Sequence, residues 1–348
     1  MLLAIDWALL LEKFILIALV VTVSMVVAMY ATWGERKIAA VIQDRYGPNR
    51  AGPLGLFQPL ADGLKLFMKE EIIPNASNKI LFILGPSLAM LTALITSAVI
   101  PWGDKMEAFG RTISLQIADI NIGILYVFGV VSLGVYGIMI GAWASNNKFS
   151  LMGGLRAASQ IISYELAMGI VLIALLMTTG TLSLGEIVKQ QQEGWWNVIK
   201  QPVGFVVFLI CAFAECNRTP FDLAEAENEL IGGYHSEFSS MKLGFYLFAE
   251  YINMFISSAV MATLYFGGYD IIPFYDESAW GLSTNTMAVL GLLALFAKIF
   301  VLIFVFMWVR WTIPRFRYDQ LMNLGWKSLI PISLIWMLLT AVFMLLIK

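Results

Sequence analysis

The chain has 348 residues, of which 59% are hydrophobic and 13% are charged, and its mean hydropathy is +0.79. Apolar runs of membrane-spanning length recur from end to end and lack the short polar and apolar alternation of an outer-membrane barrel, so no strand is required. The sequence therefore predicts an all-α polytopic membrane protein. The formal net charge of −2 says little, and we expect no nucleic acid among its partners.

We predict about eight transmembrane helices, whose boundaries are soft by several residues. The predicted spans cover residues 8–33, 80–101, 119–143, 160–180, 203–218, 243–267, 288–310 and 328–347. The first run has no cleavage site of small residues and is followed at once by Glu35, Arg36 and Lys37, so it is predicted to be retained. No long repeat or separate soluble domain is evident, and residues 1–348 are expected to form a single transmembrane domain.

The basic residues between the spans gather on one side of the membrane. If the connecting segments alternate between two sides, one side collects most of the Lys and Arg residues, including Arg36, Arg45, Arg156 and Arg315. The other side has only Lys105, Arg111, Lys189, Lys200 and Lys348. By the positive-inside rule the first side is the inner one, which places both termini on the outer side.

The first inner segment is long and is predicted to contain a helix that lies in the membrane interface. Residues 43–53 are dense in Gly and Pro and indicate turns. Leu60 and Leu64 then recur at helical spacing, with Asp62 on another face, as in an amphipathic interfacial helix. This helix is either an ordinary surface anchor or, with Arg36 and Arg45 at its flanks, the mouth of a cavity that opens near the membrane surface.

Glu165, Glu250 and Lys298 fall well inside predicted spans, where a charge is costly unless it faces water or other polar groups. Glu165 and Glu250 each lie within an apolar run, and each is either functional or held in a structural hydrogen bond. Lys298 lies about a dozen residues before Arg310, near the middle of its span at ~1.5 Å per residue. It needs an acidic or watery neighbour, and Glu225 or another acid of the same region is the candidate.

Residues 215–235 carry the densest group of carboxylates in the chain. On a notional helix Glu215, Asp222 and Glu229 share one side with Glu225 a little off it, whereas Glu227 points away. Pro220 predicts a kink or break in this run, because it removes a backbone donor and restricts the preceding residue. Freed backbone beside acids at the end of a span indicates a wet, proton-accepting cavity, and the alternative is a solvated acidic loop between two spans.

The chain offers few ligands for a redox centre. Cys211 and Cys216 are its only cysteines, and His235 is its only histidine. This set predicts no iron–sulfur cluster, bis-histidine haem or ordinary zinc site, and no Gly-rich nucleotide loop opens a helix. His235 follows two glycines and a tyrosine, and we interpret it as a polar contact of the loop. Redox or nucleotide chemistry is therefore expected to come from partner proteins.

Several motifs together give a resemblance that runs nearly the whole length of the chain. They occupy residues 35–37, 43–50, 55–67, 163–165, 215–225, 249–251 and 314–322. In this order they resemble the H-type membrane component of respiratory complex I, which is subunit 1 in mitochondria. Cys216 stands where Thr is expected and Ala224 where Pro is often found, and neither change touches an ionisable position.

The resemblance implies a membrane-arm subunit at the joint with the peripheral arm, with a quinone, either ubiquinone or menaquinone, as the substrate. It implies no metal, iron–sulfur cluster or flavin in this chain, because electrons arrive from an iron–sulfur cluster in a neighbouring soluble subunit. The other implied partners are small and antiporter-like membrane subunits and lipid. By motif position, the residues that line or flank the quinone cavity are Arg36, Arg45, Asp62, Glu225, Lys298 and Arg310. The path that links quinone reduction to proton-pumping subunits contains Glu165, Glu215, Asp222, Glu227, Glu229 and Glu250.

Two other functions compete with this interpretation. The equivalent subunit of a membrane-bound hydrogenase, or of a ferredoxin-linked or coenzyme-F-linked complex, shares the same ancestry, but the long segment from Gln43 to Phe67 favours the quinone enzyme. A free-standing channel or transporter is a different class, and the chain has no pair of inverted halves to support it. The inner membrane of a bacterium is the favoured location, ahead of the mitochondrial inner membrane.

Overall fold

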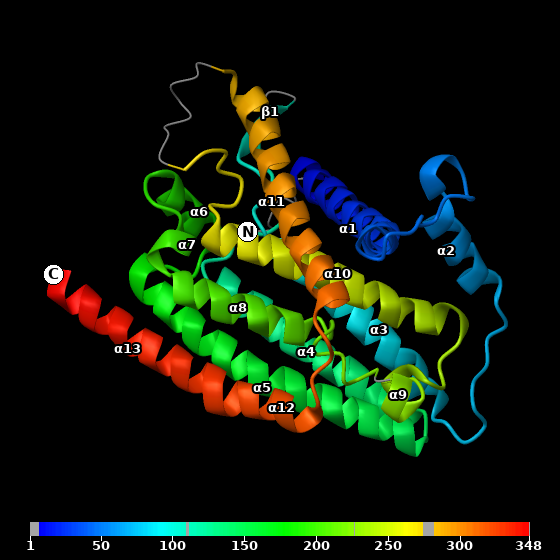
Figure 1. Cartoon of the computed structure of the whole chain (residues 1–348). Coiled ribbons are helices and arrows are strands. Elements are labelled where there is room, and N and C mark those ends of the chain that lie inside the picture. The colour runs from blue at the N-terminus through cyan, green and yellow to red at the C-terminus, as the bar shows by residue number, and fades with distance from the viewer. Residues whose placement is uncertain (1–6, 109–110, 226, 274–281, 348) are drawn as a thin grey trace, which may run out of the picture.

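A computed structural model describes residues 7–108, 111–225, 227–273 and 282–347. Within these ranges, seven helical segments are long and apolar enough to cross a membrane (Figure 1). They are α1 (Trp7–Ile42), α3 (Lys79–Thr96), α4 (Gly123–Ala144), α5 (Lys148–Thr179), α10 (Ser240–Tyr265), α11 (Thr284–Thr312) and the run from α12 (Tyr318–Asn323) through a π-helical turn (Leu324–Leu329) into α13 (Ile330–Ile347). The prediction of an all-α polytopic protein is confirmed.

The remaining predicted span, residues 203–218, is the short helix α8 (Pro202–Glu215), which has 14 residues. At ~1.5 Å per residue it reaches ~21 Å, against a hydrocarbon thickness of ~30 Å. It ends before Pro220, as the sequence predicted, and residues 216–225 continue as turns and irregular backbone. The acids after Glu215 therefore do not follow the notional helix on which the sequence analysis arranged them.

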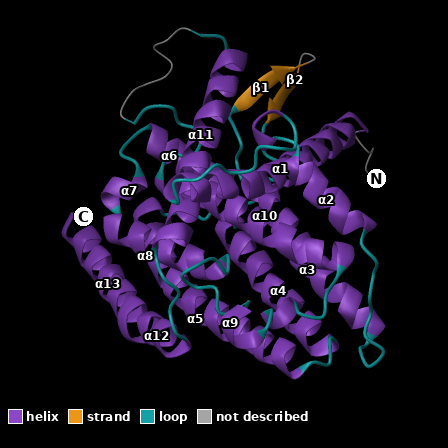
Figure 2. Cartoon of the chain, turned by 45° about the vertical axis from the view of Figure 1, so that its right-hand side comes forward, coloured by secondary structure: helices purple, strands orange, loops and turns teal. Residues whose placement is uncertain are grey.

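Short elements occupy the two ends of the bundle. A hairpin of β1 (Lys105–Ala108) and β2 (Arg111–Ser114), with Lys105 opposite Ser114, lies near the start of α11 (Figure 2). The helices α6 (Leu184–Gln192) and α7 (Asn197–Lys200) lie toward the same end, whereas α9 (Glu227–Leu230) and α12 lie at the opposite end (Figure 1). The sequence does not predict this hairpin, because its strands are short and show no clear alternation of polar and apolar residues.

The helix α2 (Gln58–Met68) confirms that the first inner segment contains a helix. Its apolar side chains Leu60, Leu64 and Phe67 are all exposed in the isolated chain. A helix that keeps such a face uncovered fits a position in the membrane interface. The chain between α1 and α2 includes a short 3-10 turn (Pro53–Gly55).

Two helices extend well beyond the predicted spans. The first span was expected to end at residue 33, yet α1 continues to Ile42 and carries Glu35 and Arg36 on its last turns. Similarly, α5 begins at Lys148, so Arg156 lies on a helix and not in a loop. Hydropathy marks where the apolar run ends, whereas Glu, Arg and Lys are good helix formers and allow the helix to continue beyond it.

Polar side chains fix the helix ends locally. The side-chain oxygens of Asn147, Ser183 and Ser283 accept hydrogen bonds from backbone N–H groups at the first turns of α5, α6 and α11. Each cap satisfies a donor that a helix start leaves free. Gly180 ends α5 in the left-handed conformation, with φ of 69°, which glycine adopts without strain.

Small residues bring α3 and α4 into close contact. A Cβ added to Gly137 would lie 2.8 Å from the backbone nitrogen of Ala89, and one added to Gly141 would lie 1.9 Å from the hydroxyl oxygen of Tyr246. Tyr246 of α10 fills this gap and donates a hydrogen bond of 3.1 Å to the carbonyl of Gly137. Close backbone approach at small residues is the usual way in which membrane helices pack.

The centre of the bundle is formed by α10, which packs against α1, α3 and α11. In its most apolar window 67% of residues are buried, whereas the corresponding window of the last span is 17% buried and exposes most of its side chains in the isolated chain. Most ionisable groups described below lie on α10 or contact it. The packing of other helices around α10 therefore determines which charged residues come into contact.

Candidate functional site

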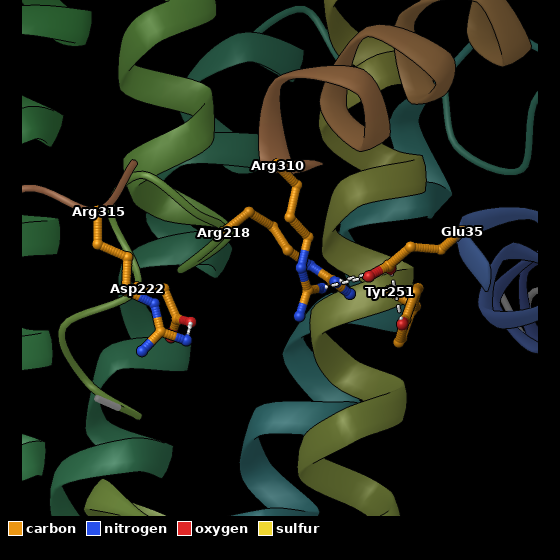
Figure 3. A network of polar contacts seen from close by, with 6 residues as sticks. All are labelled: Glu35, Arg218, Asp222, Tyr251, Arg310 and Arg315. Carbon is orange, nitrogen blue, oxygen red and sulfur yellow. Dashed lines mark hydrogen bonds and ion pairs between the residues drawn. The ribbon is translucent and has the colours of Figure 1, made fainter. Parts of the chain in front are cut away.

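Glu35, near the C-terminal end of α1, is the centre of a buried polar network (Figure 3). Its carboxylate lies 2.8 Å from Nη1 of Arg310 on α11 and 3.1 Å from Nη1 of Arg218, which follows α8. The hydroxyl of Tyr251 on α10 donates to the same carboxylate at 2.8 Å. Glu35 is 5% exposed, so one acid, two guanidinium groups and a phenol meet largely away from water.

Arg218 is the most deeply buried base of this network, with 3% of its surface exposed. Its guanidinium carbon lies 4.0 Å from the centre of the Tyr251 ring, in a cation–π contact. Within the described part of the chain, its Nε and Nη2 atoms have no hydrogen-bond partner. Buried donors of this kind are rare in native proteins and indicate room for water or another polar group.

A second ion pair joins α1 to the interfacial helix. Nη1 of Arg36 lies 2.7 Å from Oδ2 of Asp62 on α2, and Gln58 donates to the same carboxyl group at 3.2 Å. Both members are partly exposed, with 49% and 27% of their side-chain surfaces accessible. Arg45 stays exposed and donates from Nε to Gln43 at 2.7 Å. Of the residues predicted around a cavity mouth, Arg36 and Asp62 thus meet as one pair.

Glu250, the neighbour of Tyr251 on α10, belongs to a separate acidic cluster. The phenol of Tyr234 donates to Glu250 at 3.0 Å, and the Glu225 carboxyl also contacts Glu250. Burial, with the charges of Glu250 and Glu225 beside it, raises the pKa of Tyr234 well above its usual value, so the phenol remains a donor. His235 lies with its Nδ1 3.6 Å from Glu225, which fits the loop contact predicted for it.

The closeness of Glu225 and Glu250 has a direct electrostatic consequence. Two carboxyl groups that lie together largely away from water interact strongly, so a change of charge at one of them is felt by the other.

Two adjacent cavities of about 40 and 30 Å³ open beside this cluster and share Glu215, Cys216 and Asn253 among their linings. A cavity needs ~10–15 Å³ to hold a water molecule when polar groups line it, and both exceed this limit. The larger cavity is also lined by Tyr234 and Glu250, so water within it would bridge Glu215 to the acidic cluster.

Glu165 of α5 lies beyond the cavities, close enough to Glu215 for an electrostatic interaction between them. The Ser132 hydroxyl of α4 donates to Glu165. The structure thus brings together three of the predicted proton-path residues, Glu165, Glu215 and Glu250. Glu225, from the set predicted around the quinone cavity, joins them.

The remaining acids of residues 215–235 are held differently. Asp222 is buried and lies 2.9 Å from Nη2 of Arg315, which clamps the turn after α8 to the segment after α11 (Figure 3). Glu229 is more exposed and pairs at 2.7 Å with Arg156 of α5. The backbone of Glu227 opens α9, but its side chain lies outside the described residues.

The prediction that Lys298 lies beside Glu225 or an acid of the same region is wrong. Its ammonium donates to the carbonyls of Phe266 and Gly268 at 2.7 and 3.0 Å and to that of Asp270, and it lies 4.3 Å from the centre of the Trp196 ring. Phe266 lies about 16 residues beyond the Glu250 that Glu225 contacts, or ~24 Å along the helix. The lysine therefore lies at the other end of α10 from the acidic cluster.

Four central residues were not among the predicted site residues: Glu35, Arg218, Tyr251 and Tyr234. Glu35 and Arg218 occur in the quoted motifs, but hydropathy alone gives no reason to single them out. Tyr251 follows Glu250 directly, and an aromatic hydroxyl next to a buried acid was the one local signal. Among the described residues, no group of three His, Cys, Asp or Glu side chains is placed to hold a metal ion.

These features define a polytopic helical membrane protein whose bundle encloses a chain of ionisable residues. The chain matches the family model described as NADH dehydrogenase over residues 14–341, and it belongs to this family. It is 66% identical over 337 residues to an H-type component of the NADH-quinone oxidoreductase of Cytophaga hutchinsonii, covering 97% of this chain and 98% of the relative. It is 64% identical over 346 residues to the H-type component of the same enzyme in Flavobacterium psychrophilum, covering 99% and 100%. The resemblance drawn from the motifs is confirmed.

Proposed function

We propose that this chain forms part of the quinone-binding chamber of a proton-pumping NADH-quinone oxidoreductase and couples quinone reduction to proton transfer through its buried acids. One observation carries the proposal: Glu250 and Tyr251 are consecutive on α10 but belong to the two different networks. A change of charge at Glu35 is thereby linked to the proton held between Glu250 and Glu225. Such a link is what coupling requires.

Arg36, Asp62 and Arg310 form the quinone side of the site. Reduction of a quinone takes up two electrons and two protons, so the headgroup becomes negative before it is protonated. The guanidinium groups of Arg36 and Arg310 stabilise that charge, and Glu35 responds through its bond to Arg310. Arg45 is exposed and flanks the entrance. Lys298 of α11 lies beside the end of α10, too far from Glu250 for direct contact with it. Its proposed role is structural.

The buried acids form the proton side. A charge change at Glu35 alters the field at Arg218, which interacts electrostatically with both Glu35 and Glu250. The proton shared by Glu250 and Glu225 then moves through the water-sized cavities to Glu215 and on to Glu165. Asp222 and Glu229 hold the loop in shape through Arg315 and Arg156, and Glu227 completes the acidic segment.

The proposed setting follows from the same assignment. The chain lies in the plasma membrane of a bacterium, with both termini on the outer side and residues 1–348 as one transmembrane domain. The end of α1 with Arg36, and the loops that carry Arg45 and Arg315, face the soluble subunits that deliver electrons. Ser132 and Glu165 face the membrane subunits that move protons, and either ubiquinone or menaquinone serves as substrate.

Replacing Glu225 by Gln in the assembled enzyme tests this function. Gln keeps the shape of the side chain but cannot release a proton, so quinone reductase turnover and proton pumping in proteoliposomes are expected to fall ~10-fold, which corresponds to ~1.4 kcal/mol. Glu193→Gln, at an exposed position beyond α6, is the matched control and should leave both rates unchanged. Full turnover and full pumping in assembled Glu225→Gln enzyme would reject the coupling role.

A further inference from the structure

An apolar cavity lies at the end of the bundle that carries the hairpin, well away from the ionisable network. It has a volume of about 130 Å³ and lies between α1, α11 and the residues that flank the hairpin. From α1 it is lined by Leu16, Leu19 and Val23, and from α11 by Phe296. A cavity of ~150 Å³ with such walls stays dry and accepts an apolar molecule.

The cavity reaches the surface of the isolated chain on the side of α1. Leu19, one of its lining residues, is 56% exposed, so the cavity continues into the outward face of α1. Its α1 wall runs from Leu16 to Val23, or ~10 Å along the helix. The Glu35 network begins about twelve residues further on, ~18 Å away, so this cavity is separate from the quinone side.

Polar groups that suit a lipid lie at the mouth of the cavity. The ammonium of Lys13, one turn before Leu16, donates to the carbonyl of Gln116 at 3.0 Å and has two further donors. The carbonyl of Leu115, which also lines the cavity, accepts from the backbone N–H of Trp102 at 3.1 Å. Lys13 and Trp102 therefore flank the same stretch of chain.

Trp102 supplies the second observation. Its ring lines the cavity and stacks on Phe255 and Phe296, with centroids 5.6 and 6.0 Å apart. The residue is 6% exposed, and its Nε1 has no hydrogen-bond partner in the described part of the chain. A buried indole N–H normally finds an acceptor, and a carbonyl oxygen supplied by a bound molecule meets this need.

We propose that this cavity binds one acyl chain of a bilayer phospholipid. The chain fills the apolar space beside Leu16 and Val23, an ester carbonyl lies near Trp102, and the phosphate lies near Lys13. Lys13 precedes Leu16 and Val23 along α1, as the phosphate precedes the hydrocarbon in a phospholipid. This site is independent of the proposed quinone chemistry.

Photolabelling of the purified complex in nanodiscs tests the site. The probe is a phospholipid with a diazirine in its acyl chain, and labelled peptides are mapped by mass spectrometry. In the native complex the label is expected on residues 16–23 and 292–296. Label confined to other lipid-facing helices, such as α13, would overturn the proposal without any variant.

A filling substitution provides the second arm of the test. Val23→Trp should lower labelling of residues 292–296 at least fivefold, and Val26→Trp, on the 45% exposed face of the same helix, should leave it within twofold. Lys13→Gln should lower labelling and Lys13→Arg should restore it. Equal labelling of the two Trp variants, or displacement of the probe by a quinone at lower concentration than by phospholipid, would refute a phospholipid site.

Discussion

Glu35 and Arg218 form an ion pair of 3.1 Å although 183 residues separate them in sequence, and both are almost fully buried. The pair joins the C-terminal end of α1 to the turn after α8. Because Arg310 and Tyr251 bind the same carboxylate, four segments of the chain meet at one acid. We therefore expect the stability of this end of the bundle to depend on the charge of Glu35.

Replacing Glu35 by Gln is expected to destabilise the complex strongly. The buried guanidinium of Arg218 and the partly buried one of Arg310 would lose their counter-charge, and breaking a buried pair in this way costs ~3–5 kcal/mol. Thermal unfolding of the purified complex measures the effect. Asp62→Asn is the control, because its pair with Arg36 is partly exposed and is worth ~1 kcal/mol or less. Equal loss in the two variants would contradict the central place of Glu35.

Tyr251→Phe is expected to reduce turnover more than it reduces assembly. The change removes a hydrogen bond to a charged acceptor, worth ~1.5–3 kcal/mol, while the ring that covers Arg218 remains. Quinone reductase turnover per assembled complex should fall ~10-fold. Tyr136→Phe on α4, where the tyrosine is 60% exposed, should be neutral. A native rate of turnover in the Tyr251→Phe enzyme would contradict the proposal that Glu35 takes part in coupling through Tyr251.

Tyr234→Phe should lower proton pumping by an amount that does not change in alkaline solution. An ordinary tyrosine titrates around pH 10, but the raised pKa of Tyr234 keeps its phenol neutral there. The raised pKa means that the folded state retains this proton while an unfolded chain would lose it. The ratio of variant to native pumping between about pH 9 and 10.5 is the measurement. A ratio that rises toward one would show that Tyr234 ionises in this range.

Gly141→Ala is expected to disrupt the contact of α3, α4 and α10. The new Cβ would meet the Tyr246 hydroxyl at 1.9 Å, so the tyrosine must leave its bond to Gly137. The yield of assembled complex should fall severalfold. Gly129→Ala on the same helix has no neighbour within 4 Å and should be neutral or slightly stabilising, since Ala favours helix by ~1 kcal/mol over Gly. Similar yields of both variants would show that α4 shifts freely.

Lys298→Met should lower thermal stability while turnover of the assembled complex stays near the native rate. Met fills similar volume but leaves the carbonyls of Phe266 and Gly268 without this donor. Turnover at saturating quinone and the unfolding temperature separate the two roles. Lost turnover with unchanged stability would return Lys298 to the quinone cavity.

The sequence predicted the class of fold because hydropathy is a local property. The spans, the helix at Leu60 and Leu64 and the break before Pro220 each depend on a short window of residues. Even so, the first span was ended too early, because Glu35 and Arg36 lower hydropathy without disfavouring helix.

The pairing of charged residues was harder to predict from the sequence, because it depends on which helices pack against one another. Lys298 was expected to meet Glu225 or a neighbouring acid, yet its ammonium binds carbonyls just beyond the end of α10, far from the Glu225 that contacts Glu250. Every residue has a backbone carbonyl, so no pattern of side chains in the sequence predicts where a lysine will be bound by carbonyl groups. Arg218 and Glu35 likewise have no shared local signal.

Because α8 is short, the irregular backbone after Glu215 needs hydrogen-bond partners from within the protein. Where a helix stops ~9 Å short of the hydrocarbon thickness, lipid cannot bind the freed peptide groups. Gln160 of α5 takes the place of solvent there: it is wholly buried and donates to the carbonyls of Ala214 and Phe221 at 2.8 Å each. One amide side chain thus satisfies a carbonyl at the end of α8 and another in the irregular segment that follows, and fixes the two relative to each other without solvent.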